Sequence, residues 1–111
     1  MSPDQIIFVG FNSRVAAMDR DTGQLLWKWK ARKGTGYVTV LLDGDRLIVS
    51  VIGYTYCLDP VTGQEYWFNE LSGMGTGVTS LASARGGSAP ALYAATQDEM
   101  QKSSSDSPPA T

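Results

Sequence analysis

Residues 17–27 read AMDRDTGQLLW, and residues 57–67 read CLDPVTGQEYW, which is a second version of the same eleven-residue pattern. The two segments lie 40 residues apart and share Asp, Thr, Gly, Gln and Trp at five identical positions. A period of about 40 residues is typical of repeat proteins in which each unit contributes one small sheet. The sequence therefore predicts two copies of one structural unit.

The shared residues predict a tight turn in each copy. The aspartate is placed to accept hydrogen bonds from backbone N–H groups, the threonine can hydrogen-bond back across the turn, and the glycine supplies a positive φ. The tryptophan is expected to pack over a turn or against a neighbouring unit. The residues assigned in this way are Ala17, Asp19, Thr22, Gly23 and Trp27 in the first copy and Cys57, Asp59, Thr62, Gly63 and Trp67 in the second.

The rest of the sequence has the short hydrophobic periodicity of β-strands, and no segment has a helical period. The continuous apolar run at residues 6–9 is expected to be covered on both faces, whereas Trp27, Trp29 and Ala31 share one face of an alternating strand. Short glycine-rich turns between the runs indicate an all-β meander. Nine strands are expected, over residues 6–9, 15–18, 25–31, 37–42, 46–52, 54–58, 65–71, 78–84 and 91–96.

The pattern A-x-D-x-x-T-G-x-x-x-W, complete over residues 17–27, resembles the tryptophan-docking repeat of quinoprotein-like (pyrroloquinoline quinone, or PQQ-type) β-propellers. The second copy departs from it once, with Cys57 in place of the small alanine. The resemblance covers residues 5–96 and implies four-stranded antiparallel blades. It implies one complete blade over residues 35–71, with the Trp-bearing strand outermost.

The resemblance also implies about two blades in all, offset so that both ends are incomplete. Residues 5–31 would supply the last three strands of one blade, and residues 77–96 the first two strands of another. Closed propellers have about four to eight blades, and open sheet edges favour aggregation unless they are covered. We therefore expect a homo-oligomer or a complex with another propeller fragment; three copies would give about six blades and four about eight.

Composition excludes several kinds of site. The chain has no histidine and one cysteine, so a Ser-His-Asp triad, a Cys-His pair, a histidine metal ligand and an intrachain disulfide are all absent from it. A net charge of −2 argues against nucleic-acid binding. The basic cluster at residues 28–33 is interleaved with tryptophan, and we interpret it as an outer strand protected by lysines against edge pairing rather than as a base-stacking platform.

Other candidate chemistry has a structural interpretation. We expect Asp43 and Asp45 to form a polar hairpin tip, and the turn at Asp19 lacks the later ligands of a calcium loop. The glycine-rich segments 34–36 and 73–77 precede β-type residues, whereas a phosphate loop precedes a helix. Cys57 is expected to be a small buried residue. No catalytic, cofactor-binding or metal-binding residue is identified.

Residues 97–111 are rich in serine and proline and are expected to form a disordered tail. No signal peptide or membrane-spanning stretch is recognisable, which predicts a cytoplasmic protein if Met1 is the true start.

The function expected from these observations is that of a non-catalytic propeller module, acting as a scaffold or protein-interaction surface. The alternative from the enzyme class is a fragment or subunit of a quinone-dependent alcohol or sugar dehydrogenase. Nucleic-acid binding through residues 28–33 is a third and weaker interpretation.

Overall fold

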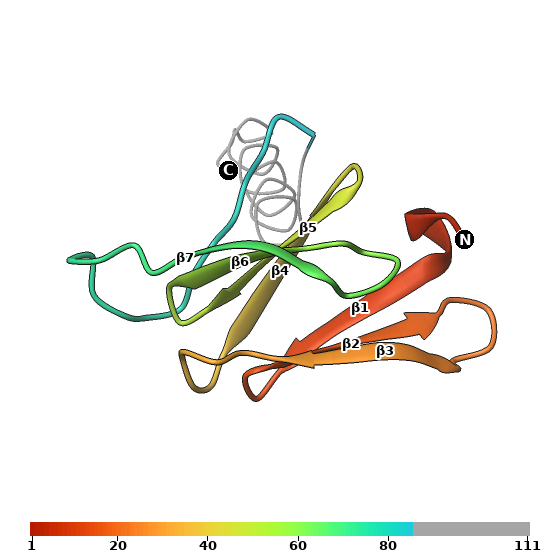
Figure 1. Ribbon diagram of the computed structural model, residues 1–111, viewed down its shortest axis with the longest axis horizontal. Helices are drawn as coiled ribbons and strands as arrows, with labels where there is room; N and C mark the ends of the chain where they lie inside the picture. The colour runs from red at the N-terminus through yellow and green to blue at the C-terminus, as the bar shows by residue number, and fades with distance from the viewer. Residues whose placement is uncertain (86–111) are drawn as a thin grey trace, which may run out of the picture.

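The fold is described for residues 1–85 of the computed structural model, and in this part of the chain the all-β prediction is confirmed. A three-stranded antiparallel sheet in the order β1-β2-β3 is followed by a four-stranded antiparallel sheet in the order β4-β5-β6-β7 (Figure 1). No helix within residues 1–85 is long and apolar enough to cross a membrane. The elements are the short 3-10 helix η1 (Pro3–Gln5), β1 (Ile6–Phe11), β2 (Arg14–Asp19), β3 (Leu25–Lys30), β4 (Val38–Asp43), β5 (Arg46–Val51), β6 (Tyr54–Leu58) and β7 (Glu65–Asn69).

Each sheet is a meander in which neighbouring strands are joined by short turns. The β1–β2 connection consists of Asn12 and Ser13, whose φ values of 51° and 65° are the positive values that a two-residue type I′ hairpin needs. The β5–β6 connection lies at the corresponding place in the second sheet, at Ile52 and Gly53, both of positive φ. The two sheets are therefore built alike, as blades of a partial β-propeller.

The core lies between the two sheets, which pack face to face. Strand β1 contacts β4, and the approach is close because a Cβ built on Gly10 would lie 2.6 Å from Val38 Cγ1. Phe8, Trp27 and Trp29 of the first sheet pack against this core from one side. Its buried residues are Val15, Ala31, Leu47, Val49, Val51, Tyr56 and Leu58.

The prediction of a strand over residues 78–84 is wrong. Ser83 makes an isolated bridge, but the segment has no regular strand. It is held to the second sheet mainly by side chains: the Oγ1 of Thr39 donates to the carbonyl of Thr79 at 2.9 Å, and Ser50 Oγ donates to Thr79 Oγ1 at 2.8 Å. Within residues 1–85 the segment does not belong to either sheet as a regular strand. The expected strand at 91–96 and the expected tail at 97–111 lie outside the described residues.

The expectation that the run at residues 6–9 is covered on both faces is also wrong. Ile6 is 5% exposed, whereas the next residue, Ile7, is 46% exposed. Successive side chains of a strand point to opposite faces, and in the described part of the chain only one face of the first sheet has a neighbouring sheet. Apolar side chains on the other face of this sheet therefore remain in contact with solvent.

Replacing Tyr56 by Phe should reveal how tightly the segment after β3 is held to the core. Tyr56 is fully buried, its hydroxyl donates to the carbonyl of Lys33 at 2.6 Å, and the N–H of Lys33 donates to the same hydroxyl at 3.0 Å. The substitution leaves both backbone groups without this partner, so the free energy of unfolding in urea should fall by about 1–3 kcal/mol. The control Tyr37→Phe, at a side chain 73% exposed, should change it by less than about 0.5 kcal/mol. Equal effects of the two substitutions would contradict this assignment.

Candidate functional site

The two repeated turns have nearly identical geometry. The aspartate Oδ1 accepts hydrogen bonds from the N–H groups two and three residues further on, at 2.8 and 3.2 Å for Asp19 and at 2.8 and 3.3 Å for Asp59. The glycine N–H donates to the aspartate carbonyl at 2.8 Å in both turns, with φ of 77° at Gly23 and 81° at Gly63. The hydroxyls of Thr22 and Thr62 each accept from the N–H of the glutamine two residues on, at 3.2 Å. The local sequence thus determines the same turn twice.

Trp27 reaches from β3 of the first sheet to the turn of the second. Its indole Nε1 donates to the carbonyl of Pro60 at 3.0 Å. A Cβ built on Gly63 would lie 2.8 Å from two atoms of the indole ring, so the ring rests directly on this glycine. Glycine is required at position 63 both by its positive φ and by the closeness of the ring.

Trp67 and the first turn have different surroundings. Trp67 is 47% exposed on β7, the outer strand of the second sheet. A Cβ built on Gly23 would meet no atom within 4 Å. The structure therefore brings together the tryptophan of the first copy and the turn of the second, and it leaves the other tryptophan and the other turn open.

A small buried residue lies opposite each tryptophan. In the strand registers Ala17 pairs with Trp27 and Cys57 pairs with Trp67, each next to a β-bulge. Ala17 is 0% exposed and Cys57 is 1% exposed. Burial raises the pKa of the Cys57 thiol, which makes this cysteine a poor nucleophile at neutral pH.

Ion pairs connect the segment after β3 to the end of the second sheet. Arg32 Nη1 lies 2.7 and 2.8 Å from the two carboxylate oxygens of Glu65, and Lys33 Nζ lies 2.7 Å from Glu70 Oε2. The Arg32 guanidinium also lies 4.5 Å from the centre of the Phe68 ring. The hydrogen bond that Arg32 donates to the Glu65 carboxylate raises the pKa of Arg32. These pairs could not be predicted from the sequence, since their partners are more than thirty residues apart and no local pattern connects them.

The aspartate of the second turn has an additional partner. The Tyr66 hydroxyl donates to Asp59 Oδ2 at 2.7 Å, and Arg46 lies over the Tyr66 ring at 4.4 Å. The hydrogen bond from Tyr66, together with those from the turn backbone, holds the pKa of the Asp59 carboxyl below its ordinary value. The first turn has Leu26 at the position of Tyr66, so this bond is specific to the second turn.

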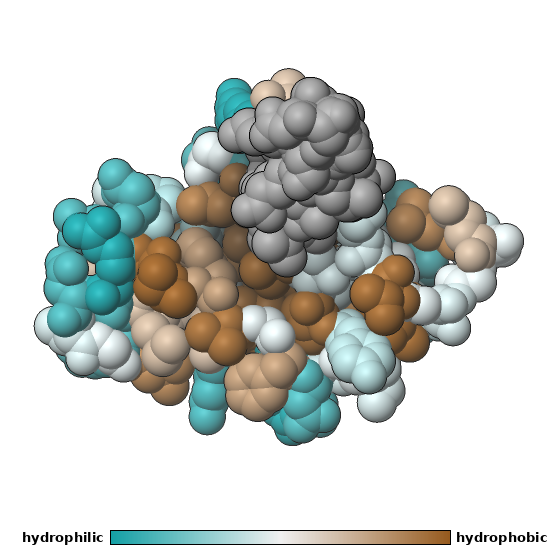
Figure 2. All heavy atoms as spheres, turned by 180° about the vertical axis from the view of Figure 1, so that it is seen from behind, coloured by the Kyte–Doolittle hydropathy of each residue, from teal (hydrophilic) through white to brown (hydrophobic). Residues whose placement is uncertain are grey.

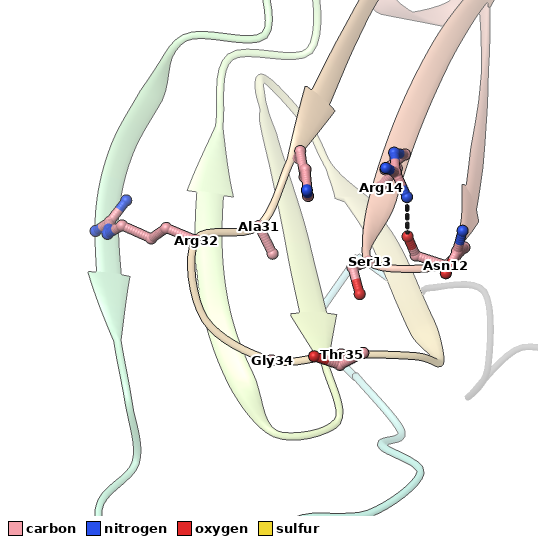
Figure 3. Close-up of a pocket in the computed structure, with 8 residues that line it drawn as sticks. Asn12, Ser13, Arg14, Ala31, Arg32, Gly34 and Thr35 are labelled. Carbon is pink, nitrogen blue, oxygen red and sulfur yellow. Dashed lines mark hydrogen bonds between the residues drawn. The ribbon is translucent and has the colours of Figure 1, made fainter.

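A hollow of about 640 Å³ lies between the β1–β2 turn and the segment that follows β3 (Figure 3). Within it the Arg14 guanidinium donates to the carbonyl of Asn12 at 2.9 Å, while Arg32 is engaged by Glu65. Within residues 1–85, no group of three or more His, Cys, Asp or Glu side chains is placed to hold a metal ion. The lining residues are Asn12, Ser13, Arg14, Lys30, Ala31, Arg32, Gly34 and Thr35.

The two tryptophans should make unequal contributions to stability. Trp27→Ala removes a ring that is packed on a turn and hydrogen-bonded, and it should lower the free energy of unfolding by about 3 kcal/mol. Trp67→Ala removes a ring that is half exposed and should lower it by no more than about 1 kcal/mol in dilute solution. Urea unfolding followed by far-UV circular dichroism measures both effects. Equal losses would show that the two rings have equivalent surroundings.

Comparison with known proteins identifies the repeat. A family model described as "Outer membrane protein assembly factor BamB", a PQQ-repeat model, matches residues 12–99. Quinoprotein ethanol dehydrogenases of Pseudomonas putida and Pseudomonas aeruginosa are 32% and 31% identical to the chain over 81 aligned residues. Each alignment covers 58% of this chain but only 13% of the relative's length. Since the family model matches most of the chain and the described sheets have the form of propeller blades, the chain belongs to this family of PQQ-like repeat proteins.

Proposed function

We propose that the chain is a non-catalytic PQQ-like propeller module that serves as a scaffold or protein-interaction surface. The observation that supports this most directly is that the duplicated residues make structural contacts. The aspartate, threonine and glycine of each copy build a turn, and Trp27 packs on the second of these turns. The repeated pattern thus accounts for how sheets are joined, and it requires no reaction chemistry.

We propose in addition that the contact of Trp27 with the second turn is the docking interaction between neighbouring blades. Trp67 and the turn around Gly23 are then two halves of the same interaction, each without its complement in the described part of the chain. A closed propeller needs about four to eight blades. We propose that further blades complete the module, supplied by other copies of the chain or by another propeller fragment.

The surface of the molecule supports association. Figure 2 shows apolar side chains exposed across the middle of one face. Large exposed apolar residues occur in both sheets, among them Phe11 at 58%, Leu25 at 51% and Tyr66 at 42%. Extended apolar surface on a soluble protein is typical of interaction sites.

The second candidate is a fragment or subunit of a quinone-dependent alcohol or sugar dehydrogenase. It is favoured by the similarity to the two quinoprotein ethanol dehydrogenases. The hollow at the β1–β2 turn does not fit a planar, acidic quinone well: its lining is basic but contains no aromatic ring on which a quinone would stack, and Arg32 is already paired with Glu65. For this reason we rank the dehydrogenase second.

Reconstitution distinguishes the two candidates. The purified chain is incubated with pyrroloquinoline quinone and calcium, dialysed, and assayed for retained quinone by absorbance and for ethanol-dependent dye reduction. We expect no quinone retained in stoichiometric amount and no dye reduction above that of free quinone and calcium. A quinoprotein ethanol dehydrogenase stripped of its quinone and treated in parallel is the positive control. Stoichiometric retention with ethanol-dependent turnover would overturn the proposed function in favour of the dehydrogenase.

A further inference from the structure

We propose that two copies of this chain associate head to tail, with Trp67 of one copy packed on the turn formed by residues 19–23 of the next. This inference rests on the proposed function, and it identifies the partner as a second copy and names the residues that join the copies. The contact between the two sheets within one chain is its template.

The two halves of the proposed contact correspond to the observed one through the 40-residue repeat. Trp67 corresponds to Trp27, and Gly23 corresponds to Gly63. Space for the ring exists at the first turn, because no atom lies within 4 Å of the Cβ position of Gly23. In the template the indole N–H of Trp27 donates to the carbonyl of Pro60. The corresponding acceptor for Trp67 is the carbonyl of Arg20 on the other chain.

The outer face of β1 carries apolar side chains of the kind that a neighbouring sheet covers. Ile7 and Phe11 on β1 are 46% and 58% exposed. Their counterparts on β5, Leu47 and Val51, are 0% exposed, because the first sheet covers them. The same position in the same unit is thus buried where a neighbouring sheet is present and exposed where it is missing, and the second sheet of another copy would be that neighbour.

The surface of the second sheet that would meet the other chain is apolar at its centre, as in the template, but polar at one edge position where the template is apolar. Ile48 and Cys57 stand where the template has Phe8 and Ala17, so the surface beside Trp67 is apolar. Trp29 corresponds to the polar Asn69. We therefore expect the contact between copies to be weaker than the contact between sheets within a chain.

Residues 77–83 of one chain are placed to supply the inner strand that the first sheet of the next chain lacks. In the second sheet β4 pairs with β5, with Val38 opposite Val51. Within residues 1–85, the first sheet begins at β1 and has no strand in the position that β4 has in the second sheet. Val78, 79% exposed, corresponds to Val38 and would lie beside Phe11 of the second copy. The irregular segment of one copy thus takes the vacant inner position next to β1 of the next copy.

The charged rim of the template has no counterpart between copies. Within the chain, Arg32 and Lys33 pair with Glu65 and Glu70. The residues that correspond to Arg32 and Lys33 on one chain are Ser72 and Gly73, and those that correspond to Glu65 and Glu70 on the next chain are Leu25 and Lys30. The contact between copies therefore has none of the ion pairs that are seen within the chain. Its dissociation constant should change little between 0.1 and 0.5 M salt, since screening acts on charged pairs.

Because the two contacting surfaces are different, the association is heterologous and each copy has one surface of each kind. This allows a mixing experiment with two complementary variants. Trp67→Ala removes the ring and leaves the turn, whereas Gly23→Asn leaves Trp67 and fills the space for the ring. Asparagine tolerates the positive φ at position 23. The matched control is Gln24→Asn on the same turn, because its counterpart Gln64 stays exposed although Trp27 is docked on the second turn.

Sedimentation velocity measures the mass of each sample over a range of concentrations. We expect wild type and Gln24→Asn to associate, and we expect Trp67→Ala and Gly23→Asn alone to have dissociation constants at least tenfold higher. An equimolar mixture of the two variants should form dimers with one copy of each and no larger species, because each variant retains one working surface.

Far-UV circular dichroism checks that each variant is folded. If Gly23→Asn is not folded, Phe11→Glu takes its place in the mixture, since Phe11 is exposed on the same side of the contact.

Wild-type association that persists unchanged in Trp67→Ala and in the turn variant would overturn this inference while leaving the proposed function in place. A wild-type chain that is monomeric at every concentration would overturn it as well. Ethanol-dependent dye reduction would instead overturn the proposed function and leave the contact to be decided by the mixture.

Discussion

The structure depends on one close contact, the indole ring of Trp27 against the backbone of Gly63. Any other residue at this position would place a Cβ 2.8 Å from the ring and would adopt an unfavourable positive φ. The turn that presents this glycine is held by the carboxylate of Asp59, and the ring is held by a hydrogen bond to Pro60. A short local sequence therefore builds the surface on which a side chain from another sheet rests.

The features that local sequence controls could be predicted. The turns follow from Asp, Thr and Gly at fixed spacing, because each residue bonds to backbone groups within a few positions of itself. The first seven strands were expected close to where they lie, since their hydrophobic patterns are short and bounded by turn residues. The hairpin at Asp43 and Asp45 and the burial of Cys57 follow from the same local reasoning.

The features that depend on distant neighbours could not be predicted. The two tryptophans occupy identical positions in the repeat, yet Trp27 has a turn beside it and Trp67 has none among the described residues. The pairs of Arg32 with Glu65 and of Lys33 with Glu70 join segments whose proximity is known only from the fold. Residues 78–84 have a strand-like sequence, but a strand also needs a partner, and the pattern of one segment contains no information about whether a partner is present.

A double-mutant cycle between Trp27 and Gly63, with the free energy of unfolding as the readout, measures how strongly the ring and the turn depend on each other. Gly63→Ala in the wild type introduces both backbone strain and a clash with the ring, whereas in the Trp27→Ala background it introduces strain alone. We expect Gly63→Ala to cost at least about 1 kcal/mol less when Trp27 is absent. Costs that agree within about 0.3 kcal/mol in the two backgrounds would show that the ring and the turn act independently, and that the sheets do not depend on this contact.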